Sequence, residues 1–206
     1  MSPCDFALLA QEAYSAKPDI GKADSASRAI VRQTAGGLVV AFPGTDNLDC
    51  VAADLDAHPI DVIGIGQVHH GFWKAWGAIA VDVLAAIDGR PVTLVGHSLG
   101  AAIAIMAAAA MVVGSRAPAA VYGFEPPRVS TNGSVAALLA KVPLSLYKNG
   151  NDIVPDLPPG WQHAGAIQAI GRPALPFANV TDHAIARVVE ALSVFSVPGF
   201  VLQNQA

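Results

Sequence analysis

The sequence is poor in charge and in cysteine. Only 14% of its 206 residues are charged, and its 12 Lys and Arg residues are scattered, so no basic stripe is present that would neutralise a nucleic-acid backbone. Nucleic acid is therefore not expected as a partner. The two cysteines, Cys4 and Cys50, allow at most one disulfide and lie in no CxxC or metal-ligand pattern. Neither a metal nor another cofactor is expected.

The chain also lacks a hydrophobic run long enough to cross a bilayer. The longest run, residues 100–114, consists mainly of small residues and predicts a buried helix. Residues 1–16 contain no basic leader and show helical spacing instead. Together with the few cysteines, this predicts a cytoplasmic location, and export by a route that needs no signal peptide is compatible with the same sequence.

Hydrophobic residues, in contrast, make up 53% of the chain, which is enough for the core of a single domain spanning residues 1–206. Short β-branched runs alternate with helical patterns, so we expect an α/β fold with a mostly parallel central sheet and helices on both faces. A short TAGG connection predicts an antiparallel pair at the N-terminal edge. The expected strands are residues 29–33, 38–42, 92–95, 119–124, 144–148 and 166–170, and the expected helices are residues 6–16, 72–87, 98–113, 134–139 and 182–194.

The strongest functional signal is the G-x-S-x-G motif GHSLG at residues 96–100. It lies between a predicted strand and an apolar helix, which is the context in which a serine is held exposed on a sharp strand-to-helix turn. Gly96 and Gly100 permit such a turn, and the helix N-terminus favours negative charge on a substrate oxygen. Taken alone, the motif also fits a serine that only caps a helix. Its context favours Ser98 as a nucleophile.

A nucleophilic serine needs a base and a carboxylate that orients the base, and in this type of sheet they follow in the order Ser, Asp or Glu, His. Asp152 follows a predicted strand in the loop NGNDIVPDLPP, at the strand end where such sheets place catalytic groups. We expect Asp152 to be the acid, and a plain turn aspartate is the alternative. The other acids after Ser98 are Glu125, Asp156, Asp182 and Glu190.

Two histidines follow Asp152 in the sequence, His163 and His183. His183 opens the predicted last helix, which would fix its ring at the edge of the sheet, so we expect it to be the base. His163 precedes a predicted strand and better fits a loop-supporting role. Because an isolated histidine has no functional meaning by itself, a structural role is the alternative for both.

Ester cleavage through a serine also needs N–H donors for the oxyanion. One donor comes from the residue after the nucleophile, Leu99, and the other from an earlier loop. The loop AFPGTDN follows the predicted strand 38–42, and we expect Thr45 to present its N–H there. A plain Pro-Gly turn is the alternative.

Together these segments resemble the class 3 lipases, the fungal-type lipase and feruloyl-esterase group of the α/β-hydrolases. AFPGTDN is similar to the family's FRGT oxyanion segment, VHHGFWKAW to its VHxGF helix start and GHSLGAA to its nucleophile elbow. GFEPPRVS is similar to FGxPRVG, NDIVPDLPP to the NDxVPxLPP acid loop, and DHAIARV to the terminal histidine segment. The resemblance implies an α/β-hydrolase fold, a Ser98–Asp152–His183 triad, and Thr45 and Leu99 as oxyanion donors.

Two positions depart from the family pattern. Pro43 replaces the usual arginine before the glycine of the oxyanion segment, which removes a charge and a backbone donor. Glu125 stands where the family more often has an uncharged residue, and its carboxylate is expected either to pair with Arg128 or to be exposed.

Residues 46–69 occupy the position of the helical lid that family members carry over the site. Leu48, Val51 and Leu55 share one helical face and acidic residues occupy the others, so the pattern fits an amphipathic cover. A surface helix with no gating role fits the same pattern.

We therefore expect a serine carboxylic-ester hydrolase that acts through an acyl-enzyme intermediate on acylglycerols or other lipid-like esters, with a lipid interface as a candidate partner. A phospholipase-type effector, which would share this chemistry, is one alternative. A hydrolase-fold binding protein without catalysis is the other, and intact candidates at all three triad positions argue against it. The sequence carries no signal of oligomeric state.

Overall fold

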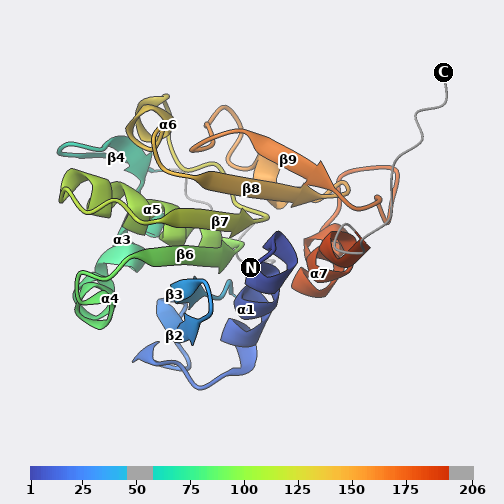
Figure 1. Ribbon diagram of the computed structural model, residues 1–206. Coiled ribbons are helices and arrows are strands. Elements are labelled where there is room, and N and C mark those ends of the chain that lie inside the picture. The colour runs from blue at the N-terminus through green and yellow to red at the C-terminus, as the bar shows by residue number, and fades with distance from the viewer. Residues whose placement is uncertain (46–57, 195–206) are drawn as a thin grey trace.

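A computed structural model describes residues 1–45 and 58–194, and its centre is a seven-stranded sheet (Figure 1). The strand order is β1-β2-β3-β6-β7-β8-β9. Strands β1 to β3 pair antiparallel, and the strands from β3 onward pair parallel. The mostly parallel sheet and its antiparallel N-terminal pair are confirmed. The strands are β1 (Ile20–Gly21), β2 (Arg28–Thr34), β3 (Gly37–Phe42), β6 (Val92–His97), β7 (Ala120–Phe124), β8 (Leu144–Asn149) and β9 (Ile167–Ile170).

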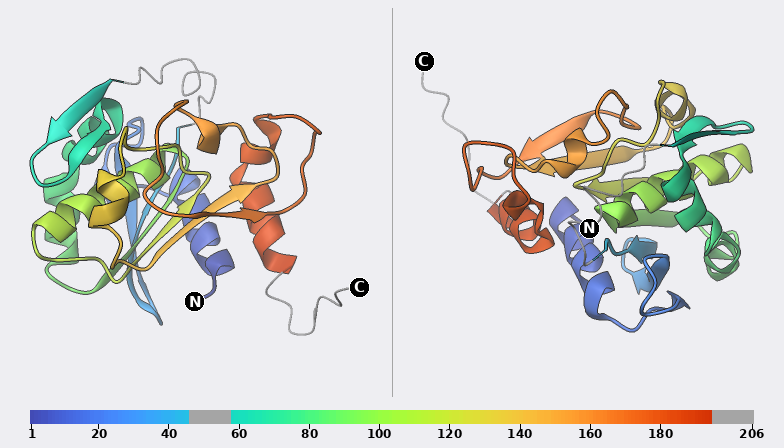
Figure 2. Two further views of the ribbon diagram at one scale, coloured as in Figure 1. Left: turned by 90° about the horizontal axis from the view of Figure 1, so that it is seen from above. Right: turned by 180° about the vertical axis from the view of Figure 1, so that it is seen from behind.

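Helices cover both faces of this sheet, as expected. Helices α1 (Pro3–Ser15) and α7 (Ile185–Val194) lie side by side on one face, and α5 (Leu99–Val113) and α3 (His70–Gly77) lie on the other (Figures 1 and 2). The remaining helices are α4 (Ala80–Ile87), α6 (Ser134–Leu138) and the 3-10 turns η1 (Val154–Asp156) and η2 (Thr181–His183).

Several helix boundaries differ from the sequence prediction, and α1 begins at Pro3, three residues earlier than expected. The helix expected over residues 72–87 is two helices, because Ile79 adopts φ −127° and ψ 2° and interrupts the helical backbone between α3 and α4. The last helix begins at Ile185, three residues later than expected, so His183 lies in the 3-10 turn η2 that precedes it.

A small two-stranded hairpin, formed by β4 (Pro59–Val62) and β5 (Gly66–His69), replaces helix in the second half of the expected lid segment. Ile60 and Val62 alternate with exposed residues and pack on the core, which is the period of a strand. Residues 46–57, including Leu48, Val51 and Leu55, lie outside the described residues.

The core has two layers because neighbouring residues of each strand point to opposite faces of the sheet. In β3, Val40 and Phe42 pack with α5, whereas Val39 and Ala41 pack with α1. All residues of β6 are buried, since both of its faces are covered. Most of α5 is buried as well, which confirms the buried helix expected at residues 100–114. Within the described ranges, no helix has the length and apolarity of a membrane span.

Parallel pairing places the carboxyl ends of β3, β6, β7 and β8 along one edge of the sheet. The segments that follow these strands carry Thr45, Ser98, Glu125 and Asp152. Residues far apart in the sequence are therefore gathered at the edge where such sheets bind ligands.

Helix α5 approaches the end of β3 so closely that Gly100 has no room for a side chain. A Cβ at Gly100 would collide with the carbonyl groups of Phe42 and Pro43, whereas one at Gly77, the last residue of α3, would meet no heavy atom within 4 Å. We expect Gly100→Ala to lower the free energy of unfolding by about 1–3 kcal/mol through overpacking. Gly77→Ala is the matched control and should be neutral or stabilising by up to about 1 kcal/mol. Urea unfolding measures both, and equal effects of the two changes would refute the close approach.

Candidate active site

Ser98 lies on a strained turn between β6 and α5. It adopts φ 57° and ψ −126°, a left-handed conformation that a residue other than glycine occupies at a cost of about 1–3 kcal/mol. The turn is held by the N–H of Ser98, which donates to the Phe124 carbonyl of β7 at 2.9 Å. A Cβ at Gly96 would collide with the Gly100 carbonyl, so only glycine fits there. The sequence prediction of a sharp strand-to-helix turn at Ser98 agrees with this geometry.

The loop after β3 packs directly against this turn. A Cβ on Gly44 would lie 2.9 Å from Ser98 Cβ and 3.1 Å from the His97 carbonyl oxygen, so Gly44 lets the two backbones approach. Thr45, the next residue, is partly buried. Leu99 opens helix α5, where backbone N–H groups have no acceptor one turn earlier in the helix. The two expected oxyanion donors therefore belong to the two segments that meet at Ser98.

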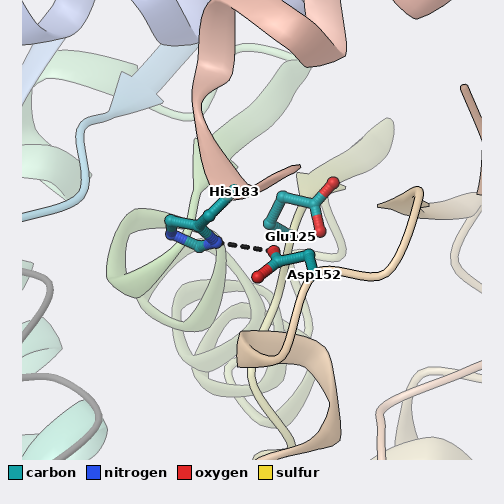
Figure 3. Close-up of side chains that lie close together, drawn as sticks. All are labelled: Glu125, Asp152 and His183. Carbon is teal, nitrogen blue, oxygen red and sulfur yellow. Dashed lines mark hydrogen bonds and ion pairs between the residues drawn. The ribbon is translucent and has the colours of Figure 1, made fainter. Parts of the chain in front are cut away.

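Asp152 and His183 form a buried hydrogen-bonded pair, although 31 residues separate them. His183 Nδ1 lies 2.6 Å from Asp152 Oδ2, and both residues are 0% exposed (Figure 3). The Val154 N–H donates to the other oxygen, Asp152 Oδ1, at 3.0 Å. Burial raises the pKa of Asp152, but the hydrogen bonds from His183, Glu125 and Val154 outweigh it and hold the pKa below its usual value. Asp152 is therefore an ionised acceptor for His183.

His97 fixes the position of His183 relative to the serine turn. His97 Nε2 lies 2.8 Å from the His183 carbonyl oxygen, and its Nδ1 lies 2.6 Å from the Tyr14 hydroxyl of α1. Burial and the nearby His183 lower the pKa of His97 to about 3, so its ring is neutral. With Nε2–H donating to the carbonyl, Nδ1 accepts from Tyr14. The residue before Ser98 thus ties helix α1 to the loop of His183.

The loop of His183 is also anchored through its neighbour Asp182. Asp182 is fully buried and accepts from the N–H groups of Asn151 at 3.0 Å and Ala174 at 3.0 Å. The Asn149 side chain donates to the Asp182 carbonyl at 2.9 Å. These bonds connect η2 to the end of β8 and to the loop after it, which carries Asp152.

Ser98 Oγ and His183 Nε2 are both buried, and neither has a hydrogen-bond partner among the described residues. A direct hydrogen bond between serine and base is therefore not formed in this structure. Such bonds are often long without substrate and tighten when substrate binds. Neither Ser98 Oγ nor His183 Nε2 is thus occupied by another hydrogen bond that a proton transfer between them would have to break.

His163, the other candidate base, lies elsewhere. Burial lowers the pKa of His163 to about 4, and its ring hydrogen bonds to the Pro155 carbonyl. The imidazole that meets Asp152 belongs to His183 instead.

Glu125 is neither exposed nor paired with Arg128, so both expectations for it were wrong. Its side chain is 0% exposed and lies beside Asp152, while Arg128 lies 3.8 Å from Asp156. Burial raises the pKa of Glu125 well above its usual value, and the hydrogen bond with Asp152 and the charge of Asp152 raise it further. Of these two neighbouring carboxyl groups, Glu125 is therefore the one that keeps its proton to higher pH.

Glu125, Asp152 and His183 also carry the ligand atoms that come closest to a metal-binding set in the described ranges, all within 4.8 Å of one another. The hydrogen bond between His183 Nδ1 and Asp152 Oδ2 already joins two of these three groups. A cation would have to break this bond, so we assign no metal to this cluster.

The sequence analysis did not predict three features of the site. These are the contacts of His97, the contact of Tyr14 and the burial of Glu125. His97 is the variable position of G-x-S-x-G, and its contact with Tyr14 spans 83 residues. No local pattern indicates such a contact. Glu125, in contrast, carried a signal, because it is a charged residue directly after a buried strand.

A family model for class 3 lipases matches residues 39–161. The chain belongs to the class 3 lipase family. A secreted mono- and diacylglycerol lipase of Fusarium solani is 31% identical over 175 residues, which cover 77% of this chain and 50% of the relative. One of Penicillium cyclopium is 28% identical over 144 residues, which cover 66% of this chain and 47% of the relative. The chain thus spans about half the length of these relatives.

Solved structures support the fold. A Rhizomucor miehei lipase in a propeptide complex superposes with a TM-score of 0.69 at 22% identity, and the match covers 90% of this chain and 79% of that lipase. The expected α/β-hydrolase fold of this class 3 lipase is therefore confirmed.

The expected cytoplasmic location is wrong on this comparison, because the Fusarium and Penicillium relatives are named as secreted proteins. The expectation relied on the few cysteines and on the first residues of the sequence. These residues form helix α1, which packs on the sheet and hydrogen bonds to His97, so their pattern reflects a role in the fold.

The raised pKa of Glu125 predicts how stability changes with pH. An unfolded glutamic acid ionises near pH 4.3, whereas buried Glu125 keeps its proton to higher pH. Above about pH 4.3 the folded protein binds one proton more than the unfolded chain, so its stability falls by about 1.4 kcal/mol per pH unit until Glu125 ionises. The Glu125→Gln variant cannot ionise there and should lack this loss. Urea unfolding of both proteins from pH 4 upward measures the difference, and a difference that stays constant would contradict a protonated Glu125.

Proposed function

We propose that this class 3 lipase hydrolyses carboxylic esters through an acyl-enzyme intermediate, with Ser98 as nucleophile, His183 as general base and Asp152 as the acid that orients His183. The observation that carries the proposal is the buried Asp152–His183 hydrogen bond of 2.6 Å, held beside the strained turn of Ser98. This arrangement meets the needs of a serine nucleophile, since the imidazole is oriented by Nδ1 and leaves Nε2 to accept the serine proton.

In the first half of the reaction, Ser98 Oγ attacks the ester carbonyl carbon while His183 Nε2 takes the hydroxyl proton. The tetrahedral intermediate collapses, the ester C–O bond breaks, and the alcohol leaves with the proton from His183. In the second half, His183 takes a proton from water, whose oxygen attacks the acyl carbon. The carboxylic acid is released, and Ser98 regains its proton.

We propose the N–H groups of Leu99 and Thr45 as donors to the oxyanion in both halves. The packing of Gly44 against Ser98 supports this, because it brings the loop of Thr45 to the first turn of α5. Pro43 has no N–H of its own, so the donors in this loop begin after it. Donors fixed in this way stabilise the charge that develops in the transition state by several kcal/mol.

Acylglycerols are the substrate class that we propose, because two family relatives are named as mono- and diacylglycerol lipases. The net charge of −4 favours neutral glycerides over anionic phospholipids at a lipid interface. We further propose that residues 1–206 act as one domain.

The test of the proposal is the loss of activity in Ser98→Ala. We expect this variant to hydrolyse p-nitrophenyl butyrate and emulsified diacylglycerol about 10⁴- to 10⁶-fold more slowly, and to lose labelling by a fluorophosphonate. Ser193→Ala, which removes an exposed hydroxyl of α7, is the matched control and should keep both properties. A folded wild-type protein that is neither labelled nor active would refute the proposal.

The choice between the two histidines has its own prediction. His183→Ala removes the base that meets Asp152 and should lower kcat by about 10⁴- to 10⁶-fold. His163→Ala removes a ring that hydrogen bonds to the Pro155 carbonyl and should change kcat by less than about fivefold, because this ring belongs to no step of the reaction. Steady-state kinetics on p-nitrophenyl butyrate compare the two. The assignment fails if His163→Ala shows the larger loss.

A further inference from the structure

Glu125 is a buried acid that the reaction proposed above does not use. It lies immediately after β7, the strand next to the nucleophile strand, and it adopts φ 51°, a left-handed conformation that favours glycine. A glutamate in this position accepts both backbone strain and the burial of a carboxyl group. Both features destabilise the fold, and packing alone does not require a glutamate here. Its presence therefore needs another explanation.

The two oxygens of the Glu125 carboxyl group have different surroundings. Its Oε1 accepts a hydrogen bond of 2.6 Å from the Asn149 N–H at the end of β8. Its Oε2 is buried, and no donor among the described residues reaches it. The neighbouring group is Asp152, which already accepts from His183 and Val154. One carboxyl oxygen of Glu125 and one of Asp152 lie within 4.8 Å of each other, so Asp152 is the nearby acceptor for an O–H on Glu125.

The geometry points to Glu125 as a positioning residue, whose carboxyl group donates a hydrogen bond to Asp152 and so holds it in the orientation that accepts His183 Nδ1–H. This inference rests on the triad proposed above and extends it by one residue. Glu125, Asp152 and His183 then form a buried row of side chains that leads from the end of β7 to the base, and Figure 3 shows the hydrogen bond of this row that joins His183 to Asp152.

Charges around Glu125 agree with this role. The groups that face it are Asp152 and His183, and the nearby charge is that of Lys148 on β8, which lies 2.6 Å from Asp156. A second carboxylate beside ionised Asp152 in a buried site would repel it. A protonated Glu125 instead disperses the charge of Asp152 without neutralising it, so His183 keeps its anionic partner.

Two kinds of substitution at Glu125 distinguish a role as hydrogen-bond donor from a role in packing alone. Glu125→Gln keeps the size of the side chain, a donor for Asp152 and an acceptor for Asn149. Glu125→Met keeps the size but removes both. Glu125→Gly also removes the donor and relieves the left-handed strain, so it provides a second donor-free variant if the Met variant does not fold.

We expect the donor-free variants to lower kcat on p-nitrophenyl butyrate by about ten- to a hundredfold with KM within about threefold, because they lose a hydrogen bond to a charged group in the site. Glu125→Gln should recover activity to within about fivefold of the wild type. Asp156→Asn, which removes a half-exposed carboxylate from the same region, is the matched control and should change kcat by less than about twofold.

The result that overturns the inference is equal kcat for wild type and both donor-free variants. A loss in Glu125→Gln as large as that in Glu125→Met also overturns it, because the negative charge rather than the donor would then be required.

A readout that needs no turnover distinguishes failure of this inference from failure of the proposed function. The proton resonance of His183 Nδ1–H should keep its position in Glu125→Gln and shift in Glu125→Gly. An unshifted resonance in both variants contradicts the inference even if the protein is an active esterase. Absence of all esterase activity in the wild type, with the expected shifts present, contradicts only the proposed function.

Discussion

The site depends on one constraint, the close approach of helix α5 to the ends of β3 and β6 at Ser98. Carbonyl groups of Phe42 and Gly100 occupy the space that side chains at Gly100 and Gly96 would need. At this crowded point Ser98 adopts its left-handed conformation, and a Cβ on Gly44 would lie 2.9 Å from Ser98 Cβ. The segments that carry the proposed nucleophile and the proposed oxyanion donors therefore meet at one place.

The second half of the site depends on burial. Asp152, His183 and Glu125 are all fully buried, so the hydrogen bonds that hold them come from the protein itself. Asn149, Asp182 and His97 provide the connections between β8, η2 and the serine turn. The hydrogen bonds at His183 Nδ1 and at its carbonyl oxygen fix the orientation of this residue and leave Nε2 without a partner among the described residues. Orientation of the base is the property that the proposed acyl transfer requires.

Much of this arrangement could be predicted from the sequence, because the determining signals are local. The spacing of hydrophobic residues predicted the main strands. The strand and helix predicted on either side of GHSLG indicated that this motif holds a serine on a sharp turn. The hairpin β4–β5 was missed because its alternation is short and lies in a segment that resembles a lid. The partners of His97 and Glu125 could not be predicted, since their contacts join residues that only the folded sheet brings together. The cytoplasmic location was predicted wrongly because the few cysteines and the residues that form helix α1 were interpreted as evidence against export.

The central claim is that Ser98, His183 and Asp152 act as one unit on an ester carbonyl. The most direct test is a crystal structure of the protein after reaction with an alkyl phosphonate ester that mimics the tetrahedral intermediate. We expect a covalent bond from Ser98 Oγ to phosphorus, a phosphonyl oxygen that accepts from the N–H groups of Leu99 and Thr45, and His183 Nε2 within hydrogen-bond distance of Ser98 Oγ. A phosphonate attached to another residue, or a His183 ring turned away from the adduct, would contradict it.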